Sequence, residues 1–303
     1  SAGQSVVINP GFSFIFTGTI CLITGTILLM WLGERITERG IGNGISLIIM
    51  IGIVSRLPNV IVSEIALINE GVRSVLSELI LLAIMFAVIS FVVLLTQGTR
   101  KIPVSYAKRV VGRKVYGGQS THIPLKVNTA GVMPIIFAQS IMFIPSTIAT
   151  FFSESDFMQT VMRWFSFDHP FYWIVFGLMI VFFTYFYTAI AFDPTQVSQQ
   201  MKQHGGFIPG IRPGKKTAEY IDNILSRVTL PGSFALAAVA VFPYVLMQLM
   251  DVSYDLASFF GGTSLLIIVG VALDTLQQIE SHLMSRHYDG FLAKGKIRGR
   301  RRI

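Results

Sequence analysis

Few residues of this chain could carry out chemistry, and their spacing fits no catalytic or metal-binding pattern. The five histidines form no HExxH pair and have no cysteine partner at ligand spacing; they are His122, His169, His204, His282 and His287. Cys21 is the only cysteine, so neither a disulfide within the chain nor a thiolate metal site can form. The chain has no GxSxG motif and no Walker loop. We therefore expect no enzyme activity, no metal and no cofactor.

Two polar segments rich in basic residues have features of defined structure. Residues 207–217, FIPGIRPGKKT, contain two prolines, two glycines and three basic side chains, and the prolines restrict the backbone. Residues 97–126 alternate β-forming residues around VVGRKV, which predicts a hairpin with Arg113 and Lys114 at its tip. Beyond residue 214, the apolar side chains follow a helical spacing at Ala218, Ile221, Ile224 and Leu225.

The elements that must position these segments are membrane spans. Hydrophobic residues make up 52% of the chain, charged residues only 13%, and the mean hydropathy is +0.64. Such values are typical of a polytopic membrane protein. Seven apolar runs have about the length that a bilayer helix needs: 12–32, 41–62, 79–96, 127–149, 171–192, 228–250 and 256–273. The expected fold is therefore all-α, with about seven transmembrane helices and a cytoplasmic β-hairpin loop.

The distribution of basic residues predicts the orientation in the membrane. All but three of the 24 lysines and arginines fall in the loops 33–40, 97–126 and 192–228 or in the tail from residue 282; the three exceptions are Arg56, Arg73 and Arg163. Positively charged loops stay on the cytoplasmic side. The C-terminus is therefore expected in the cytoplasm, and the long basic loops 97–126 and 192–228 are expected to form a docking platform there.

Two spans are interrupted in ways that suggest a function. Arg56 and Pro58 break the run 41–62, and before it the alternating glycines of residues 40–44 loosen the backbone around Asn43, a candidate N-cap for a helix that starts at Ile45. That helix then presents a narrow aliphatic stripe of Ile45, Ile49 and Gly52.

The second interrupted span is 127–149. Pro134 and Pro145 are expected to kink it, and it also contains the polar side chains of Asn128, Gln139 and Ser140. A kinked span with amide groups near its middle is a candidate for a surface that moves and is partly exposed to water.

The spans have almost no charged or imidazole groups, which argues against a proton-coupled pump. Three functions remain open from the residues alone. The chain could be a passive conduit for unfolded protein, a small-molecule permease with a site at the broken helices, or a membrane scaffold that only docks cytoplasmic partners. A permease requires a compact polar pocket in the spans, and a scaffold requires that the aliphatic stripe never meets a substrate.

Several long motifs resemble the bacterial SecY family, the channel subunits of the Sec translocon. They are GERITERGIGNGIS, the segment from AKR to VYGGQSTHIPLKVN, GFIPGIRPG followed by KTAEYID, and FGGTSLLI. The resemblance extends over the whole chain, and it implies spans four to ten of the ten that the family has in two pseudo-symmetric halves. Residues 1–78 would then end the first half, 79–281 would form the second half, and 282–303 would be a basic tail. We therefore expect the full protein to be longer than this chain.

The resemblance also implies a protein-conducting channel in the bacterial inner membrane. Its narrow ring of aliphatic side chains would contain Ile45, Ile49, Ile136 and Ile267, and bulky groups of this kind close a pore without binding any one substrate. A lateral gate toward the lipid would be formed by the span 127–149, with Asn128, Pro134, Gln139 and Ser140, together with the span 171–192.

The same resemblance implies partners on the cytoplasmic side. The channel would be passive and driven by the SecA motor or by the ribosome through its ribosomal RNA. The implied contacts are Lys101, Lys108, Arg109, Arg113 and Lys114, with Arg212 as a key contact for the motor. Further implied partners are the SecE and SecG subunits, the translocating polypeptide and membrane lipid.

Overall fold

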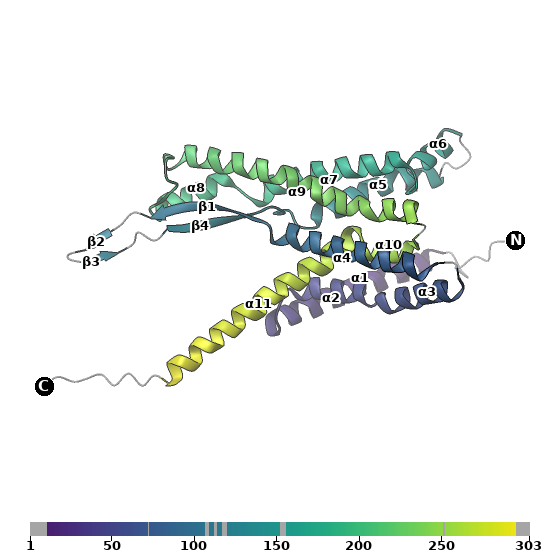
Figure 1. The fold of residues 1–303 in the computed structure, drawn as a ribbon, viewed down its shortest axis with the longest axis horizontal. Helices are drawn as coiled ribbons and strands as arrows, with labels where there is room; N and C mark the ends of the chain where they lie inside the picture. The colour runs from purple at the N-terminus through teal and green to yellow at the C-terminus, as the bar shows by residue number, and fades with distance from the viewer. Residues whose placement is uncertain are drawn as a thin grey trace. The chain divides into compact units, whose positions relative to one another are not determined.

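The fold is described from a computed structural model that covers residues 11–71, 73–106, 109–111, 114–116, 120–151, 156–250 and 252–294. In chain order, its helices are α1 (Phe12–Arg39), α2 (Gly44–Val54), α3 (Leu57–Asn69), α4 (Val75–Gln97), α5 (Met133–Phe151), α6 (Asp156–Trp164), α7 (Pro170–Ala191), α8 (Pro194–Gln203), α9 (Lys215–Met250), α10 (Tyr254–Phe260) and α11 (Gly262–Lys294). The strands are β1 (Thr99–Tyr106), β2 (Arg109–Val111), β3 (Lys114–Tyr116), β4 (Ser120–Lys126) and β5 (Gly206–Phe207). Figure 1 shows this order along the ribbon.

The expected polytopic helical fold is confirmed. Six helical stretches of the described chain are long and apolar enough to cross a membrane: Phe12–Arg39, Gly44–Asn69, Val75–Gln97, Pro170–Gln203, Lys215–Met250 and Gly262–Met284. The seventh predicted span corresponds to α5, whose apolar part, Met133–Ala149, is shorter. The predicted hairpin is also present, because β1 pairs antiparallel with β4 and β2 with β3.

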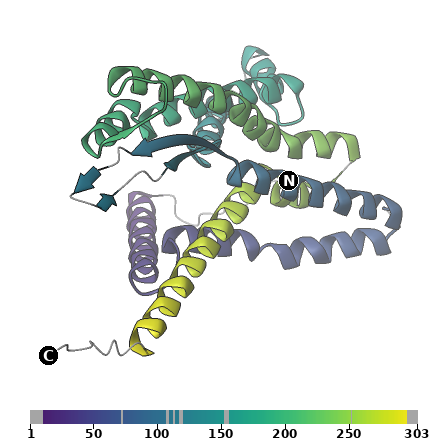
Figure 2. The same ribbon diagram turned by 60° about the vertical axis from the view of Figure 1, so that its left-hand side comes forward.

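The chain forms two compact units, which are described separately. One consists of Ser1–Ser55 together with Val271–Ile303, and the other of Arg56–Gly270. The first unit contains α1, α2 and most of α11. In that unit, α1 and α2 meet at a steep angle (Figure 2).

The second unit is built around α5, α7 and α9, which lie side by side (Figure 1). The buried side of α7 is a stripe with one residue in every four: Tyr172, Phe176, Ile180, Thr184 and Thr188. This spacing places them on one face of the helix. Gly177 of α7 lies opposite Ala237 of α9. On α5, Phe137 packs against Tyr187 with ring centroids 5.2 Å apart. Small residues and aromatic rings thus hold the three helices together.

Three expected helix boundaries differ from the structure. Pro134 does not kink a span, because α5 begins at Met133 and the proline lies in its first turn, where a missing backbone N–H costs no hydrogen bond. The span expected over 256–273 is divided at Gly261 into α10 and α11, and the Gly261 backbone packs directly against the ring of Pro243. The helix after the break, α11, extends to Lys294. The span expected over 228–250 is the second part of one helix, α9, that begins at Lys215.

Two local predictions are confirmed. The run 41–62 is interrupted where expected, since α2 ends at Val54 and α3 begins at Leu57 with Pro58 in its first turn. The helical spacing after residue 214 marks the start of α9, where Ala218, Ile221 and Leu225 are buried.

Candidate functional site

The start of α2 is defined by contacts around Asn43. The Asn43 side chain accepts a hydrogen bond from the Ser46 N–H at 3.2 Å, which confirms the predicted N-cap, although the helix begins at Gly44, one residue earlier than expected. Of the alternating glycines, only Gly42 has a positive φ, +93°. Gly40 and Gly44 do not have a positive φ, so the conformational freedom of glycine does not explain why they are glycines.

Gly44 instead permits close packing between α1 and α2. A Cβ atom at Gly44 would overlap the carbonyl oxygen of Gly33 on α1, and one at Gly33 would collide with the Ile45 side chain. Thr37 of α1 adds a hydrogen bond, because its Oγ1 accepts from the Gly44 N–H at 2.8 Å. The helix that carries Ile45 and Ile49 is thereby held against α1 at its first turn.

The four isoleucines expected in the pore ring are divided between the two units. Ile45 and Ile49 in the first unit are 45% and 47% exposed. In the second unit, Ile136 on α5 is 42% exposed, and Ile267 on α11 is half-buried. Each of the four lies on a helix and presents an aliphatic side chain that is not enclosed in the core of its own unit.

The residues expected in the lateral gate lie in different environments. Asn128 precedes α5 instead of lying inside a span, and its buried Oδ1 accepts no hydrogen bond within the described part of the chain. Pro134 is fully buried. Ser140 is exposed and donates to the carbonyl oxygen of Ile136 at 2.8 Å. Gln139 lines a cavity. The structure therefore does not bring these four side chains together in one cluster.

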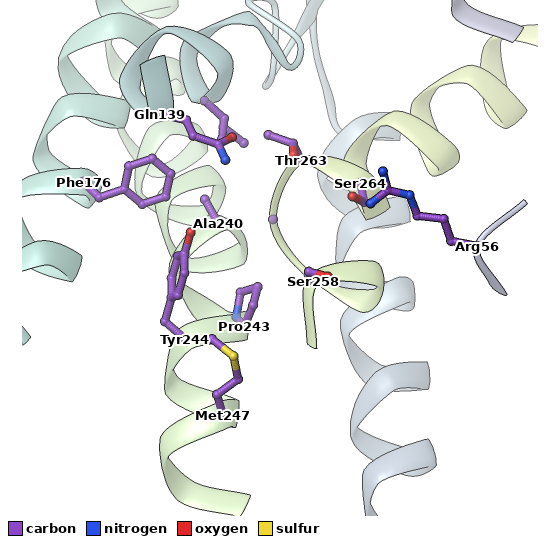
Figure 3. A pocket seen from close by; sticks show the side chains of 13 residues that line it. Arg56, Gln139, Phe176, Ala240, Pro243, Tyr244, Met247, Ser258, Thr263 and Ser264 are labelled. Atoms are coloured by element: carbon purple, nitrogen blue, oxygen red, sulfur yellow. The ribbon is translucent and has the colours of Figure 1, made fainter. Parts of the chain in front are cut away.

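The cavity that contains Gln139 has a volume of about 220 Å³ and mixes polar and apolar groups. Figure 3 shows Gln139, Phe176 and Tyr244 on one side, facing Ser258, Thr263 and Ser264, with Arg56 beyond them. These residues come from α5, α7, α9, α10, the beginning of α11 and the residue before α3. The helix α5 thus has water-accessible polar space along one side.

The two long loops meet in one sheet and one core. We use the name docking platform for β1–β4 together with α8, β5 and residues 208–214. Its three-stranded sheet has the order β4-β1-β5, with Ser105 opposite Phe207 and Tyr106 opposite Gly206. Residues from both loops share one hydrophobic core of Ile102, Val104, Leu125, Met201, Ile208 and Ile221. The loops are therefore positioned by each other and by the first turns of α9.

The segment around Arg212 is held by hydrogen bonds to its backbone. Thr217 Oγ1 donates to the Arg212 carbonyl at 3.0 Å, and Ser198 Oγ donates to the Gly214 carbonyl at 2.7 Å. Gly210 and Gly214 have φ values of +83° and +103°, which a side chain would make unfavourable. The Arg212 side chain itself is exposed, so a fixed backbone carries a guanidinium that solvent can reach.

The other expected docking residues are only partly described. Lys101 on β1 is exposed and alternates with the buried Ile102 and Val104. Arg109 begins β2 and Lys114 begins β3. Lys108 and Arg113 lie outside the described residues.

A buried ionic group was missed by the sequence analysis. Arg73 Nη1 lies 2.9 Å from Glu64 Oε2 and 3.7 Å from Glu78 Oε2, while Ser253 donates a hydrogen bond to the other oxygen of Glu64. Glu64 is 5% exposed. These residues connect α3, the start of α4 and the segment before α10. No sequence pattern identifies the group, because Ser253 lies far along the chain from its partner.

Comparison with known proteins agrees with the motifs. Residues 1–276 match the family model for SecY. The chain belongs to the SecY family. It is 46% identical to the protein translocase subunit SecY of Haemophilus influenzae over 299 residues, which cover 98% of this chain and 67% of the relative. The SecY of Escherichia coli is 45% identical over the same shares of the two chains.

A solved structure of SecY shows the same fold. A structure described in a study of how the plug domain of SecY stabilises the closed state of the translocation channel has a TM-score of 0.56 and 17% sequence identity. The match covers 86% of this chain and 65% of that one. This chain therefore spans less than two thirds of the solved SecY structure that it resembles.

Proposed function

We propose that this chain contributes the central part of a channel that moves unfolded polypeptides across the bacterial inner membrane and inserts apolar segments into it. The observation that carries the proposal is the SecY match over residues 1–276, together with relatives named as protein translocase subunits. The chain would act as a passive conduit and not as an enzyme. The six stretches of the described chain that are long and apolar enough to cross a membrane support a multi-pass location.

We propose Ile45, Ile49, Ile136 and Ile267 as ring residues. Their side chains are aliphatic and only partly covered within their own units, which suits a seal that must adapt to any passing sequence. A ring without polar groups excludes water and ions and offers no specific hydrogen bond to a substrate.

We propose that α5 and α7 form one side of the lateral gate, with Asn128, Pro134, Gln139 and Ser140. The support is the packing of Phe137 against Tyr187 and Phe183, which would make the two helices move as one body. The polar cavity beside Gln139 would allow that side of α5 to shift without breaking a closely packed apolar contact.

We propose that the docking platform faces the cytoplasm and binds SecA or the ribosome, through Arg212, Lys101, Lys108, Arg109, Arg113 and Lys114. Its support is the shared core of the two loops and the fixed backbone around the exposed Arg212. A guanidinium is a forked donor suited to carboxylate, carbonyl or phosphate. The C-terminus would also be cytoplasmic, and SecE and SecG would accompany the chain in the lipid bilayer.

We also propose that the chain is divided into the parts that the resemblance to the SecY family implies. Residues 1–78 would close the first of two pseudo-symmetric halves, 79–281 would form the second, and 282–303 would be a basic cytoplasmic tail. The match to 67% of the length of two relatives is compatible with part of a first half lying outside the chain.

The experiment that tests the proposal places a photo-crosslinking residue at position 136 of the complete protein and traps a secretory precursor halfway across the membrane. A covalent adduct between precursor and position 136 is expected, with none at the matched control position Leu94, a 70% exposed residue of α4. Adducts confined to Lys101 or Arg212 would instead identify a docking scaffold without a conduit.

A further inference from the structure

One side chain of α11 reaches the loop between α1 and α2. Gln278 Oε1 accepts a hydrogen bond from the backbone N–H of Gly42, with an N···O distance of 2.7 Å. At Gly42 the backbone also approaches α11 closely, since a Cβ atom there would lie 3.2 Å from Thr275 Oγ1. With its φ of +93°, Gly42 adopts a conformation that other residues reach only with strain. This backbone conformation of Gly42 places its N–H within hydrogen-bonding distance of Gln278.

The bonded residue lies directly before the first turn of α2. Asn43 caps the helix, and Ile45 and Ile49 follow within its first two turns. A contact that holds Gly42 therefore adds to the contact between Gly33 and Gly44 in fixing the start of the helix that carries both isoleucines. On the other side of the bond, Gln278 lies eleven residues beyond Ile267 on the same helix, roughly 16 Å along its axis.

The surroundings of the bond are polar. A cavity of about 400 Å³ borders Gln278 and is lined by Asn43, Ser46, Asp274, Thr275, Gln277 and Ser281. Gln278 itself is exposed. Water can therefore replace either partner of this bond at a small net cost, which makes the bond reversible.

We propose that Gln278 is a positioning residue for the channel: by accepting a hydrogen bond from Gly42, it holds α2, with Ile45 and Ile49, against α11. The helix α2 can move away from α11 only when water takes the place of this bond. This inference rests on the proposed function, because it assigns the isoleucines to a ring that must close.

The test uses three variants of the complete protein. Gln278→Leu removes the acceptor, Gln278→Glu retains an acceptor at the same reach, and Gln277→Leu is a matched control in the wall of the same cavity. The first readout is hydrogen–deuterium exchange of the segment 40–44. Exchange should become about 2- to 10-fold faster in Gln278→Leu and remain close to wild type in the other two.

The second readout is ion conductance of the channel in a planar bilayer without a polypeptide substrate. Gln278→Leu should raise this leak, whereas Gln278→Glu should restore the wild-type level. A leak caused only by an added apolar side chain in this cavity would appear in Gln277→Leu as well.

The outcomes separate this inference from the proposed function. Unchanged exchange in Gln278→Leu, or equal effects of Gln278→Leu and Gln278→Glu, would overturn the positioning role. Faster exchange with an unchanged leak would show that the bond holds α2 but does not control closure, and would also overturn it. A wild-type protein that neither conducts nor translocates would refute the proposed function instead, while the exchange result still decides whether Gln278 holds Gly42.

Discussion

Two carboxylates share one guanidinium in the unit that contains α3 and α4. The side chains of Arg73, Glu64 and Glu78 are only 11%, 6% and 16% exposed, so each ion has lost most of its water. Such a group is stable only while every member has a partner, because an isolated buried charge is far more costly than a buried pair. Ser253 supplies a hydrogen bond to Glu64 from a segment 189 residues away. The group therefore joins parts of the unit that are distant in sequence.

Replacing Arg73 by alanine should destabilise the protein strongly. The expected loss in free energy of unfolding is about 3 to 5 kcal/mol, since both carboxylates would remain buried without a positive partner. Arg73→Lys should recover part of this loss, because lysine restores the charge but not the forked geometry. The measurement is equilibrium unfolding of the purified protein in detergent.

The matched control for this prediction is Arg35→Ala. Arg35 pairs with Glu38, but the two side chains are 48% and 63% exposed. Its removal should cost less than about 1 kcal/mol. Equal losses for Arg73→Ala and Arg35→Ala would mean that burial of the first group has no energetic consequence.

At the residue scale, local features could be predicted and distant ones could not. The Asn43 cap was predictable because the cap and the amide that it bonds lie three residues apart. The partners of Glu64 were not, since its contacts depend on how α3, α4 and the segment before α10 pack together. The proline- and glycine-rich composition of residues 207–217 indicated a defined structure, and the resemblance to the SecY family pointed to Arg212. The bonds from Thr217 and Ser198 required the structure.

At the scale of elements, the contact between α1 and α2 requires glycine at two positions. Gly33 and Gly44 face each other where the helices meet, so backbone touches backbone. Small residues at a helix contact allow this close approach in membrane proteins, where association depends on packing and hydrogen bonds. Thr37 strengthens the contact through its bond to Gly44.

The substitution Gly44→Ala should force α1 and α2 apart. The added methyl group would overlap the Gly33 carbonyl and approach Ile36, and a backbone cannot yield as a flexible side chain can. We expect a loss of about 1 to 3 kcal/mol in free energy of unfolding, as for other cases of overpacking. Thermal unfolding in detergent would measure it.

Gly18→Ala is the control on α1. Nothing lies within 4 Å of a Cβ atom at Gly18, and alanine favours a helix more than glycine does. This variant should therefore be neutral or slightly more stable. If Gly44→Ala behaved in the same way, the close contact between α1 and α2 would not exist in the protein.

Some helix boundaries could be predicted from the neighbouring residues, and others could not. Pro58 correctly marked a break, because α3 begins beside it. Pro134 was assigned a kink but starts a helix, since a proline in a first turn and a proline inside a helix look alike in sequence. The break at Gly261 escaped prediction because its cause, contact with the ring of Pro243, joins two helices.

At the scale of the whole molecule, the docking platform allows the most direct test of the proposed partners. It combines residues from the two loops 97–126 and 192–228, with β1 paired to β5. Because Arg212 is exposed while its backbone is fixed, its side chain can be removed without loosening the fold.

Arg212→Ala should weaken binding of a cytoplasmic partner without destabilising the protein. We expect a loss of affinity of about 10-fold or more, the usual consequence of removing a hydrogen bond to a charged group. Binding of SecA and of ribosomes to the complete channel would be measured alongside secretion. Arg227→Ala, an exposed position on α9, is the control and should leave binding nearly unchanged. Normal binding and secretion by Arg212→Ala would exclude this arginine from docking.

The length of α9 has a mechanical consequence. This helix runs without interruption from Lys215, beside the Arg212 segment, to Met250, so it is roughly 54 Å long. A hydrogen-bonded helix of this kind resists compression, and the places where it can bend are Pro231 and Pro243, which interrupt the backbone bonding. If a partner bound at Arg212 as proposed, a push there would be carried along α9, and any bending would be concentrated at Pro231 and Pro243. Pro243 and Tyr244 also line the polar cavity, so a change in the bend at Pro243 would move one wall of that cavity.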